Sequence, residues 1–409
     1  MFYIVNAILL FMYIYMFSLS TFGLPYELHS QRVSAVCIFL YGLYCCSKNK
    51  KSLFRVKSSR DFVQYTIMCI MLLLYSFILL AIVGKKEGDH MFETMANICL
   101  FTLPVTWGLV NIFDNIEEFM KTLVIVGLIQ SVIICYCLVD ESFAFMLDVS
   151  FNDVGGSDYS SGHRSGYAGG LGCITAPGVI KYSTGLLAVC YLYNKTRKSY
   201  LLVIFLLFSI LSSMIARTGL LIDVVCLAYI IKTSAKTKQM IGFIIPIVFL
   251  SLLVYSLVSS GNYDDFIAER YRRMADLNEG GVDSFFGGYF SGSFPDLSFR
   301  SFCLGVGMVS GISGTGDIVH VDGGPLRIYS AIGFIFTVCV YLFFIKIMCK
   351  NIFKQRCLDD KLFMLTVLFV YFIAEFKEFT FFTIWAMSIY FCIVLLINRT
   401  NKSNVVYGL

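Results

Sequence analysis

The sequence predicts an all-α, polytopic membrane protein, and three observations support that prediction. Of the 409 residues, 58% are hydrophobic and only 14% are charged, and the mean hydropathy is +0.77. Helices of about 20 apolar residues cross a bilayer, so a chain of this length and composition can hold many of them. Hydrophilic residues concentrate in two segments, 140–169 and 260–322. We expect a single integral membrane domain over 1–409 with these segments as loops outside the bilayer.

Apolar runs of about 15 to 24 residues define the predicted spans. The N-terminal run has no basic region before it and no A-x-A cleavage site, so we interpret it as a spanning helix rather than a signal peptide. The run 218–231 is short, and we expect it to be tilted, half-buried or continuous with its neighbour. The 12 predicted spans lie near 2–20, 31–47, 62–83, 92–113, 119–139, 170–193, 200–216, 218–231, 239–259, 323–345, 362–376 and 381–397.

The basic residues divide unevenly between the two sides of this layout. Of the 32 Lys and Arg residues, 20 lie in one set of loops and the C-terminal tail, and eight lie in the opposite loops. Because cytoplasmic loops carry an excess of Lys and Arg, we expect both termini in the cytoplasm. The segment 260–322 then forms a large outer, periplasmic loop that caps the bundle. The loops and tail that hold the 20 are 47–61, 114–121, 194–199, 232–238, 346–361 and the residues after 398.

The 260–322 loop contains side chains that suit an anionic ligand. It holds 11 glycines and one histidine, and its arginines are Arg270, Arg272, Arg273 and Arg300. Residues 264–277 are predicted to form a short amphipathic helix that presents Arg270 and Arg273 on one stripe. Arginine forks bind phosphate in a bidentate manner. A solvated helix with Glu269 and Asp276 as local partners is the alternative.

Ionisable side chains also occur in or beside the predicted spans, where desolvation is costly and such residues are usually functional. Arg217 fits either a functional or a snorkelling interfacial residue. Lys181, which follows a Pro177-Gly178 break, and Asp223 fit a buried pair or a water-filled groove as well as a direct role. Arg327 lies just inside the tenth span. The cluster of Glu375, Lys377 and Glu378 is interpreted as a solvated outer turn.

Three motifs follow one another in the region 212–333. SSMIARTGLL runs from Ser212 and opens a helix, ERYRR lies at 269–273 in the long loop, and HVDGGPLRIYSAIG leads from His320 into the next span. In this order, and with this layout of spans, they resemble the bacterial O-antigen polymerase (Wzy) and O-antigen ligase (WaaL) superfamily. That resemblance implies a GT-C-like fold and a metal-independent glycosyltransferase without a cofactor at the outer face of the bacterial inner membrane.

The resemblance also implies roles for particular residues. Arg217 and Arg270 match the arginines that bind the diphosphate of an undecaprenyl-linked donor. His320 matches the residue thought to act as base on the acceptor hydroxyl, and Asp322 could orient it. A second arginine after the loop helix is not obvious, so Arg273 is a further candidate. Supporting candidates are Arg272, Arg327 and Asp223.

The chemistry agrees with these residue types. A sugar diphosphate already has a good leaving group, and fixed arginines can neutralise its developing charge without a metal. A histidine with a pKa near neutrality suits removal of the acceptor proton. No Cys or His spacing typical of zinc occurs among the 15 cysteines and four histidines.

We expect a polymerase that joins undecaprenyl-diphosphate-linked oligosaccharide repeat units into polysaccharide. The alternatives are a ligase that transfers the polymer to a lipid A core and a flippase for the same lipid-linked sugar. A transporter is disfavoured because no internal repeat is visible and the arginine and histidine candidates share one surface. Expected partners are the lipid-linked oligosaccharide, membrane lipid and a chain-length regulator protein. Basic residues are dispersed, so no nucleic acid is expected.

Overall fold

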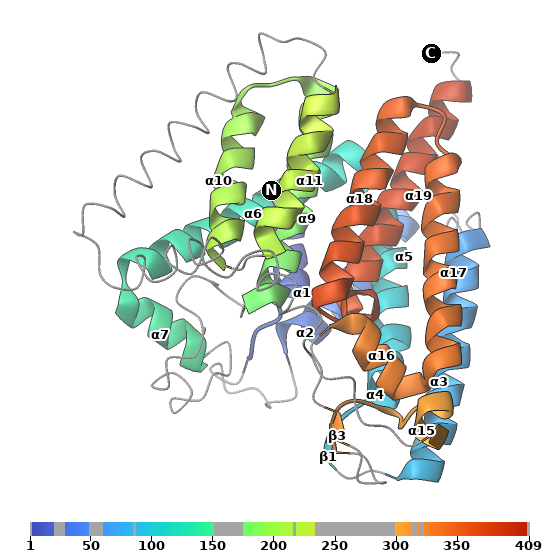
Figure 1. The fold of residues 1–409 in the computed structure, drawn as a ribbon. Helices are drawn as coiled ribbons and strands as arrows, with labels where there is room; N and C mark the ends of the chain where they lie inside the picture. The colour runs from blue at the N-terminus through green and yellow to red at the C-terminus, as the bar shows by residue number, and fades with distance from the viewer. Residues whose placement is uncertain are drawn as a thin grey trace.

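The computed structural model describes residues 2–19, 29–48, 60–84, 87–150, 175–215, 218–233, 299–312, 318–319 and 323–406. Most of these residues are helical (Figure 1). The first helices are α1 (Phe2–Ile14), α2 (Ser30–Lys48), α3 (Arg60–Val83), α4 (Met91–Asn97), α5 (Leu103–Ile112), α6 (Ile116–Val139) and α7 (Glu141–Ser150). The later ones are α9 (Thr175–Thr196), α10 (Tyr200–Ile215), α11 (Thr218–Thr233), α15 (Phe299–Leu304), α16 (Gly324–Ile332), α17 (Phe334–Phe353), α18 (Leu358–Lys377) and α19 (Ile384–Val406).

Every predicted span except one overlaps one or more helices. The exception, 239–259, lies outside the described residues. By length and apolar composition, four described helices could cross a membrane: Arg60–Val83, Met91–Ile112, Ile116–Cys137 and Phe334–Lys354. The chain is therefore a helical membrane protein, as predicted, and the number of 12 spans stays a prediction.

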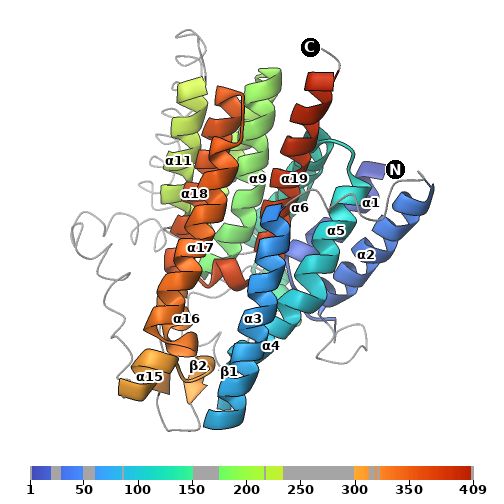
Figure 2. The same cartoon turned by 90° about the vertical axis from the view of Figure 1, so that its right-hand side faces the viewer.

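The long helices run between two ends of the bundle (Figures 1 and 2). One end carries the connections 113–115, 197–199 and 354–357, and we call it the basic end. The other, the sheet end, carries a three-stranded sheet in the order β1-β2-β3. The antiparallel strands are β1 (Glu87–His90), β2 (Met308–Ile312) and β3 (Ile318–Val319). The loop after α3 and the closing part of the 260–322 loop thus meet at one end, in agreement with their predicted location on one side.

Local chemistry explains where α6 begins and how α4 is joined to α5. The Asn115 side chain accepts a 2.9 Å hydrogen bond from the backbone N–H of Glu118 and caps the start of α6. A π-helical turn over Ile98–Thr102 joins α4 to α5 just before Pro104. Proline has no N–H to donate, and such a turn accommodates the missing hydrogen bond.

The tenth predicted span, 323–345, is not one helix. Gly333, with φ 80° and ψ 166°, separates α16 from α17. A Cβ at this position would collide with the carbonyl oxygen of Cys303, so the chain needs glycine both for its backbone angle and for the close contact. The prediction of a continuous helix was wrong because hydropathy does not register such a break.

Parts of the predicted loops also have regular structure. The first residues of the 140–169 segment form α7, and the 260–322 segment contains α15, β2 and β3. The predicted amphipathic helix at 264–277 and the rest of the 140–169 segment lie outside the described residues. Irregular backbone was expected throughout the Gly-rich half of the long loop, so its strand pairing with β1 is a difference from the prediction.

Helix α9 lies at the centre of the bundle. All its side chains over 178–194 are buried, and it packs against α6, α10, α11 and α18. A helix that is apolar on all sides is expected to be enclosed by others. In contrast, only 22% of the apolar window of Arg60–Val83 is buried, so α3 lies on the outside of the bundle, at the front of Figure 2.

Candidate functional site at the sheet end

The residues with the main predicted roles lie outside the part of the chain that the structure describes: Arg217, Arg270, Arg272, Arg273, His320 and Asp322. For Arg217, His320 and Asp322, the structure describes the residue on one side. Thr218, which follows Arg217, opens α11, and Gly323, which follows Asp322, leads into α16. The site is therefore defined by the elements to which these residues are joined.

Helix α16 begins against the C-terminal end of α18. Gly323 has φ 97°, and its backbone lies against the carbonyl oxygen of Phe376. A Cβ on Gly324 would collide with both the carboxylate and the backbone oxygen of Glu375. Two consecutive glycines thus allow the chain that emerges from His320 and Asp322 to approach α18 closely. The backbone of the HVDGGP motif is consequently fixed at its GG step.

Glu375 is the residue that α16 contacts, and its side chain is only 1% exposed. Its Oε1 accepts a 2.5 Å hydrogen bond from the Tyr341 hydroxyl, and its Oε2 accepts a 2.6 Å bond from the backbone N–H of Phe381. Arg327 on α16 acts electrostatically on this carboxylate. One carboxylate therefore joins α16, α17, α18 and the turn Thr380–Phe382 before α19.

For Glu375, the interpretation of a solvated outer turn was wrong. Lys377 and Glu378 are partly exposed, but Glu375 falls on the buried stripe of α18. That stripe includes Val367, Val370, Tyr371, Ala374 and Glu375. The 3.6-residue period of the helix would have indicated its burial, because Glu375 follows Tyr371 by one turn. It is the functional candidate that sequence reasoning missed.

Lys181 lies at the same level as Glu375 along the bundle. Helices α9 and α18 contact each other, and at the basic end Lys195 Nζ lies 3.0 Å from Asp360 Oδ1. At about 1.5 Å per residue, Lys181 and Glu375 lie roughly 21 and 22 Å along their helices from this ion pair. Lys181 is 9% exposed, so the central helix carries a buried ammonium group towards the sheet end. The Pro177-Gly178 step does not interrupt α9, since both residues fall in its first turn.

Helix α11 begins at that level too. At the basic end the Arg197 guanidinium donates a 2.7 Å hydrogen bond to the carbonyl oxygen of Thr233, the last residue of α11. Thr218, at the other end of the helix, is roughly 22 Å from Thr233 along the axis. The position that directly precedes Thr218 in the chain is Arg217. The beginning of α11 therefore belongs to the same layer of the bundle as Lys181 and Glu375.

Asp223 lies deeper and holds two helices together. The Ser212 hydroxyl on α10 is within 3.0 and 2.9 Å of its two carboxylate oxygens. A Cβ on Gly219 would collide with the carbonyl oxygen of Ser212, so α10 and α11 are in close contact. Asp223 thus joins the two helices that precede and follow Arg217 in the sequence.

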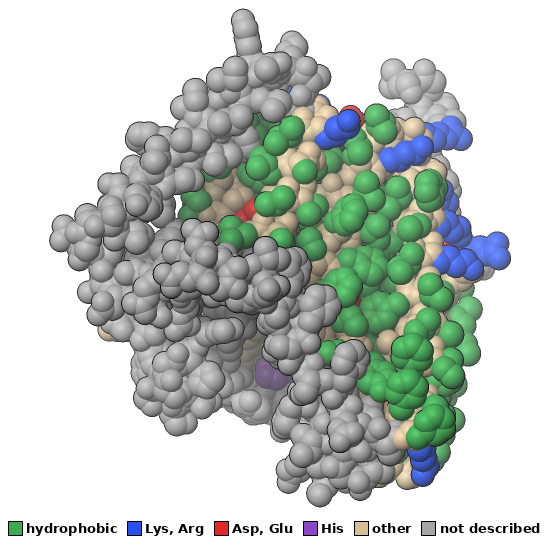
Figure 3. Space-filling model, viewed as in Figure 1, with side chains coloured by type: hydrophobic (Ala, Val, Ile, Leu, Met, Phe, Trp, Pro, Cys, Tyr) green, Lys and Arg blue, Asp and Glu red, His purple; other side chains and the backbone are tan. Residues whose placement is uncertain are grey.

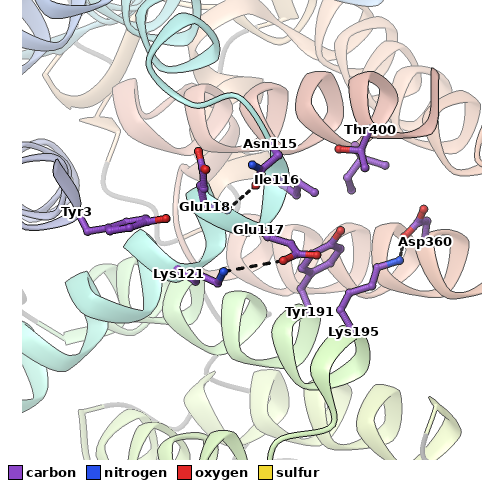
Figure 4. A pocket seen from close by; sticks show the side chains of 11 residues that line it. Tyr3, Asn115, Ile116, Glu117, Glu118, Lys121, Tyr191, Lys195, Asp360 and Thr400 are labelled. Carbon is purple, nitrogen blue, oxygen red and sulfur yellow. Dashed lines mark hydrogen bonds and ion pairs between the residues drawn. The ribbon is translucent and has the colours of Figure 1, made fainter. Parts of the chain in front are cut away.

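A cavity of about 450 Å³ opens at the basic end, at the opposite end from α16 (Figure 4). Its walls include Tyr3, Glu117, Lys121, Tyr191, Lys195 and Asp360. The lysines are already paired with carboxylates, Lys121 with Glu117 and Lys195 with Asp360. With Glu118 also in its wall, carboxylates outnumber ammonium groups, which makes the cavity unsuited to a diphosphate. Asp223 and Arg327, the predicted site residues that the structure describes, do not line it.

Fold and side chains define a helical membrane protein with ionisable residues, Lys181, Arg327 and Glu375, towards one end of its bundle. No known family model, curated protein or solved structure matches this chain. Its function is therefore inferred from its own motifs and from the arrangement of these side chains.

Proposed function

We propose that this chain is an O-antigen polymerase, a metal-independent glycosyltransferase that joins undecaprenyl-diphosphate-linked oligosaccharide repeat units into polysaccharide. It would work at the outer face of the bacterial inner membrane as a multi-pass protein with both termini in the cytoplasm. The GT-C-like arrangement of 12 spans belongs to the same proposal. Its partners would be the lipid-linked oligosaccharide, membrane lipid and a chain-length regulator protein.

One observation supports this proposal most directly. The GG step of the HVDGGP motif packs against the buried carboxylate of Glu375, which also binds Tyr341 and the N–H of Phe381. A general base must be held within hydrogen-bond reach of its substrate, so the motif that includes His320 requires a rigid anchor. Glu375 supplies this anchor at Gly324, which follows His320 and Asp322 in the sequence. A mobile surface loop would not need a carboxylate buried to 1% exposure.

The proposed chemistry divides between two motifs. Arg217 and Arg270, with Arg273 as a further candidate, bind the donor diphosphate and neutralise the charge that develops as the sugar leaves. His320 takes the proton of the attacking acceptor hydroxyl, and Asp322 orients it. Arg327 is held by α16 near Glu375, where its charge offsets that of the buried carboxylate. Its role is therefore to support the anchor.

The alternatives differ in what they transfer. A ligase would use the same donor and the same arginines and pass the polymer to a lipid A core. A flippase needs ionisable groups along a path near the middle of the bilayer. The position of Asp223 favours the flippase. This residue lies roughly 15 Å along α11 from the basic end, which is about half the thickness of a bilayer core. Its carboxylate is already paired with Ser212, however, and this pairing suits a structural role.

Glycan analysis of cells that lack the chain tests the proposal. Loss of long chains with a single repeat unit retained on the core indicates a polymerase. Complete loss of repeat units from the core indicates a ligase, and accumulation of lipid-linked units inside the cell indicates a flippase. Restoration by the intact chain, but not by the Arg217→Ala variant, would connect the result to the proposed site.

A further inference from the structure

A buried carboxylate at the basic end holds two lysines side by side. Asp61, in the first turn of α3, is fully buried, and it pairs with Lys350 of α17 and with Lys354, which directly follows α17. The Lys354 ammonium lies 3.4 Å from Asp61 Oδ2, and Lys350 donates to Oδ1. The two lysine side chains nevertheless remain 43% and 47% exposed. One carboxylate therefore orders two ammonium groups that lie one helical turn apart.

This cluster keeps a positive charge and unused donors. Two ammonium groups and one carboxylate leave an excess of one positive charge. Each ammonium has three N–H donors, and Asp61 occupies only one on each lysine. The lysine side chains are partly exposed, whereas Asp61 is fully buried. The exposed ammonium groups of this cluster can therefore bind a singly charged anion.

The cluster borders an apolar face formed by α3 and α17. The two helices contact each other through ring pairs such as Tyr75 with Phe336, whose centroids are 4.4 Å apart. Figure 3 shows apolar side chains over this side of the molecule, with Lys and Arg side chains along the edge towards the basic end. Exposed apolar side chains on the two helices include Val63, Ile67, Met71, Leu342, Ile345 and Phe353.

In a membrane this arrangement sets the depth of the lysines. The apolar face lies among acyl chains, and lysine stems extend along it so that their ammonium groups reach the head-group level. Lys346, which lies one turn before Lys350 on α17, is exposed too. It adds a third ammonium group, on the apolar face near its edge. Head groups with a net negative charge are attracted to such a site, each lysine contributing about a fivefold gain in affinity.

We propose that Lys350 and Lys354, ordered by Asp61, bind the phosphodiester of an anionic glycerophospholipid whose acyl chains cover the α3–α17 face. The charges match, because a single phosphodiester neutralises the net positive charge of the cluster. A zwitterionic lipid carries its own ammonium and is bound less well. The site is independent of the polymerase proposal and requires only that α3 and α17 cross the membrane.

Binding to the full-length chain in a neutral detergent tests this site. The affinities of phosphatidylglycerol and of phosphatidylcholine with identical acyl chains are compared by native mass spectrometry. The intact chain should prefer phosphatidylglycerol. The triple variant Asp61→Asn/Lys350→Gln/Lys354→Gln should bind phosphatidylglycerol about 5-fold to 30-fold more weakly and phosphatidylcholine unchanged. It leaves no unpaired buried carboxylate, so its folding should be preserved.

Two further variants keep the test decisive. Lys354→Gln alone leaves Lys350 to pair with Asp61 and should weaken phosphatidylglycerol binding about fivefold. Lys121→Gln is the matched control, because Lys121 also pairs with a carboxylate at the basic end, Glu117 at 3.9 Å, but lines the cavity instead of the apolar face. Equal binding of the two lipids, full binding by the triple variant, or an equal loss in Lys121→Gln would overturn the proposal.

Discussion

The Tyr341 hydroxyl donates a 2.5 Å hydrogen bond to Oε1 of Glu375, and this bond ties α17 to α18 next to the start of α16. Glu375→Ala should therefore leave two buried groups without an acceptor, the Tyr341 hydroxyl and the N–H of Phe381. A buried group left unpaired costs about 1 to 3 kcal/mol. We expect a lower temperature of unfolding in detergent and a strong loss of polymer.

An exposed glutamate provides the control for this prediction. Glu117 is 49% exposed and pairs with Lys121 at 3.9 Å, and such surface pairs contribute only about 0 to 1 kcal/mol. Glu117→Ala should leave unfolding and polymer nearly unchanged. If Glu375→Ala behaves like Glu117→Ala in both measurements, Glu375 does not anchor the motif.

Gly324→Ala should disturb the same contact from the other side. Its Cβ would collide with the carboxylate and the backbone oxygen of Glu375, and the backbone oxygen cannot move independently of α18. Overpacking of this kind typically costs about 1 to 3 kcal/mol. Polymer measured at equal protein level should fall. Gly84→Ala is the comparison, because Gly84 has φ 80° but nothing lies within 4 Å of its Cβ position, so that variant reports backbone strain without a collision. Gly324 has no such positive φ, so its loss should come from the collision with Glu375, and full polymer from Gly324→Ala would show that this contact does not matter.

Hydropathy was sufficient to predict the helices but not the way in which their ends are joined. A run of apolar residues signals a helix locally, so α3 and α6 lie within a few residues of their predicted bounds. The pairing of β1 with β2 depends on contacts between residues more than 200 positions apart, such as Gly88 with Gly311. Short Gly-rich strands carry no alternating pattern, so no period could reveal this pairing.

The candidate site was predictable only in part, because some of its features depend on contacts between helices that are distant in the sequence. Asp223 and Arg327 were expected from the cost of ionisable groups in membranes, and the structure shows what each one contacts or acts on. Glu375 was assigned to solvent because it lies in a charged cluster, although its helical phase with Tyr371 indicated burial. The level shared by Lys181 and Glu375 depends on the Lys195–Asp360 pair, which no local pattern predicts.

The predicted orientation can be tested by labelling. A cysteine at Ser293, in the 260–322 loop, should react with a membrane-impermeant thiol reagent in cells whose inner membrane is intact, because the basic residues favour the opposite side for the cytoplasm. A cysteine at Lys198, on the basic end, should react only after the inner membrane is opened. The reverse pattern would invert the topology and remove the proposed site from the outer face.

Arg217 and Arg270 are predicted to bind one donor diphosphate, although more than 50 residues separate them in the sequence. Each charge-assisted contact contributes about 1.5 to 3 kcal/mol, so Arg217→Ala and Arg270→Ala should each reduce turnover strongly at normal expression. Lysine should restore activity only partly, because an ammonium cannot form the bidentate fork. Full-length glycan from both alanine variants would show that the diphosphate is bound elsewhere.

His320 is predicted to be the general base for the acceptor hydroxyl. It precedes by a few residues the GG step that packs against Glu375, so its backbone is tied to a rigid element on that side. General-base assistance contributes about 100-fold to 10,000-fold to the rate. His320→Ala should therefore nearly abolish polymer formation from purified lipid-linked repeat units, while binding of the donor persists.

A glutamine at position 320 separates catalysis from structure. His320→Gln retains hydrogen bonding but cannot accept a proton at neutral pH, so it should be as inactive as His320→Ala if His320 is the base. If His320 only holds the loop in place, His320→Gln should remain near full activity, and Asp322 becomes the next candidate for the base. His29, which pairs with Ser18 in a β-bridge, and His90, which ends β1, are the controls. Their glutamine variants should stay active, since neither adjoins the motif anchored by Glu375.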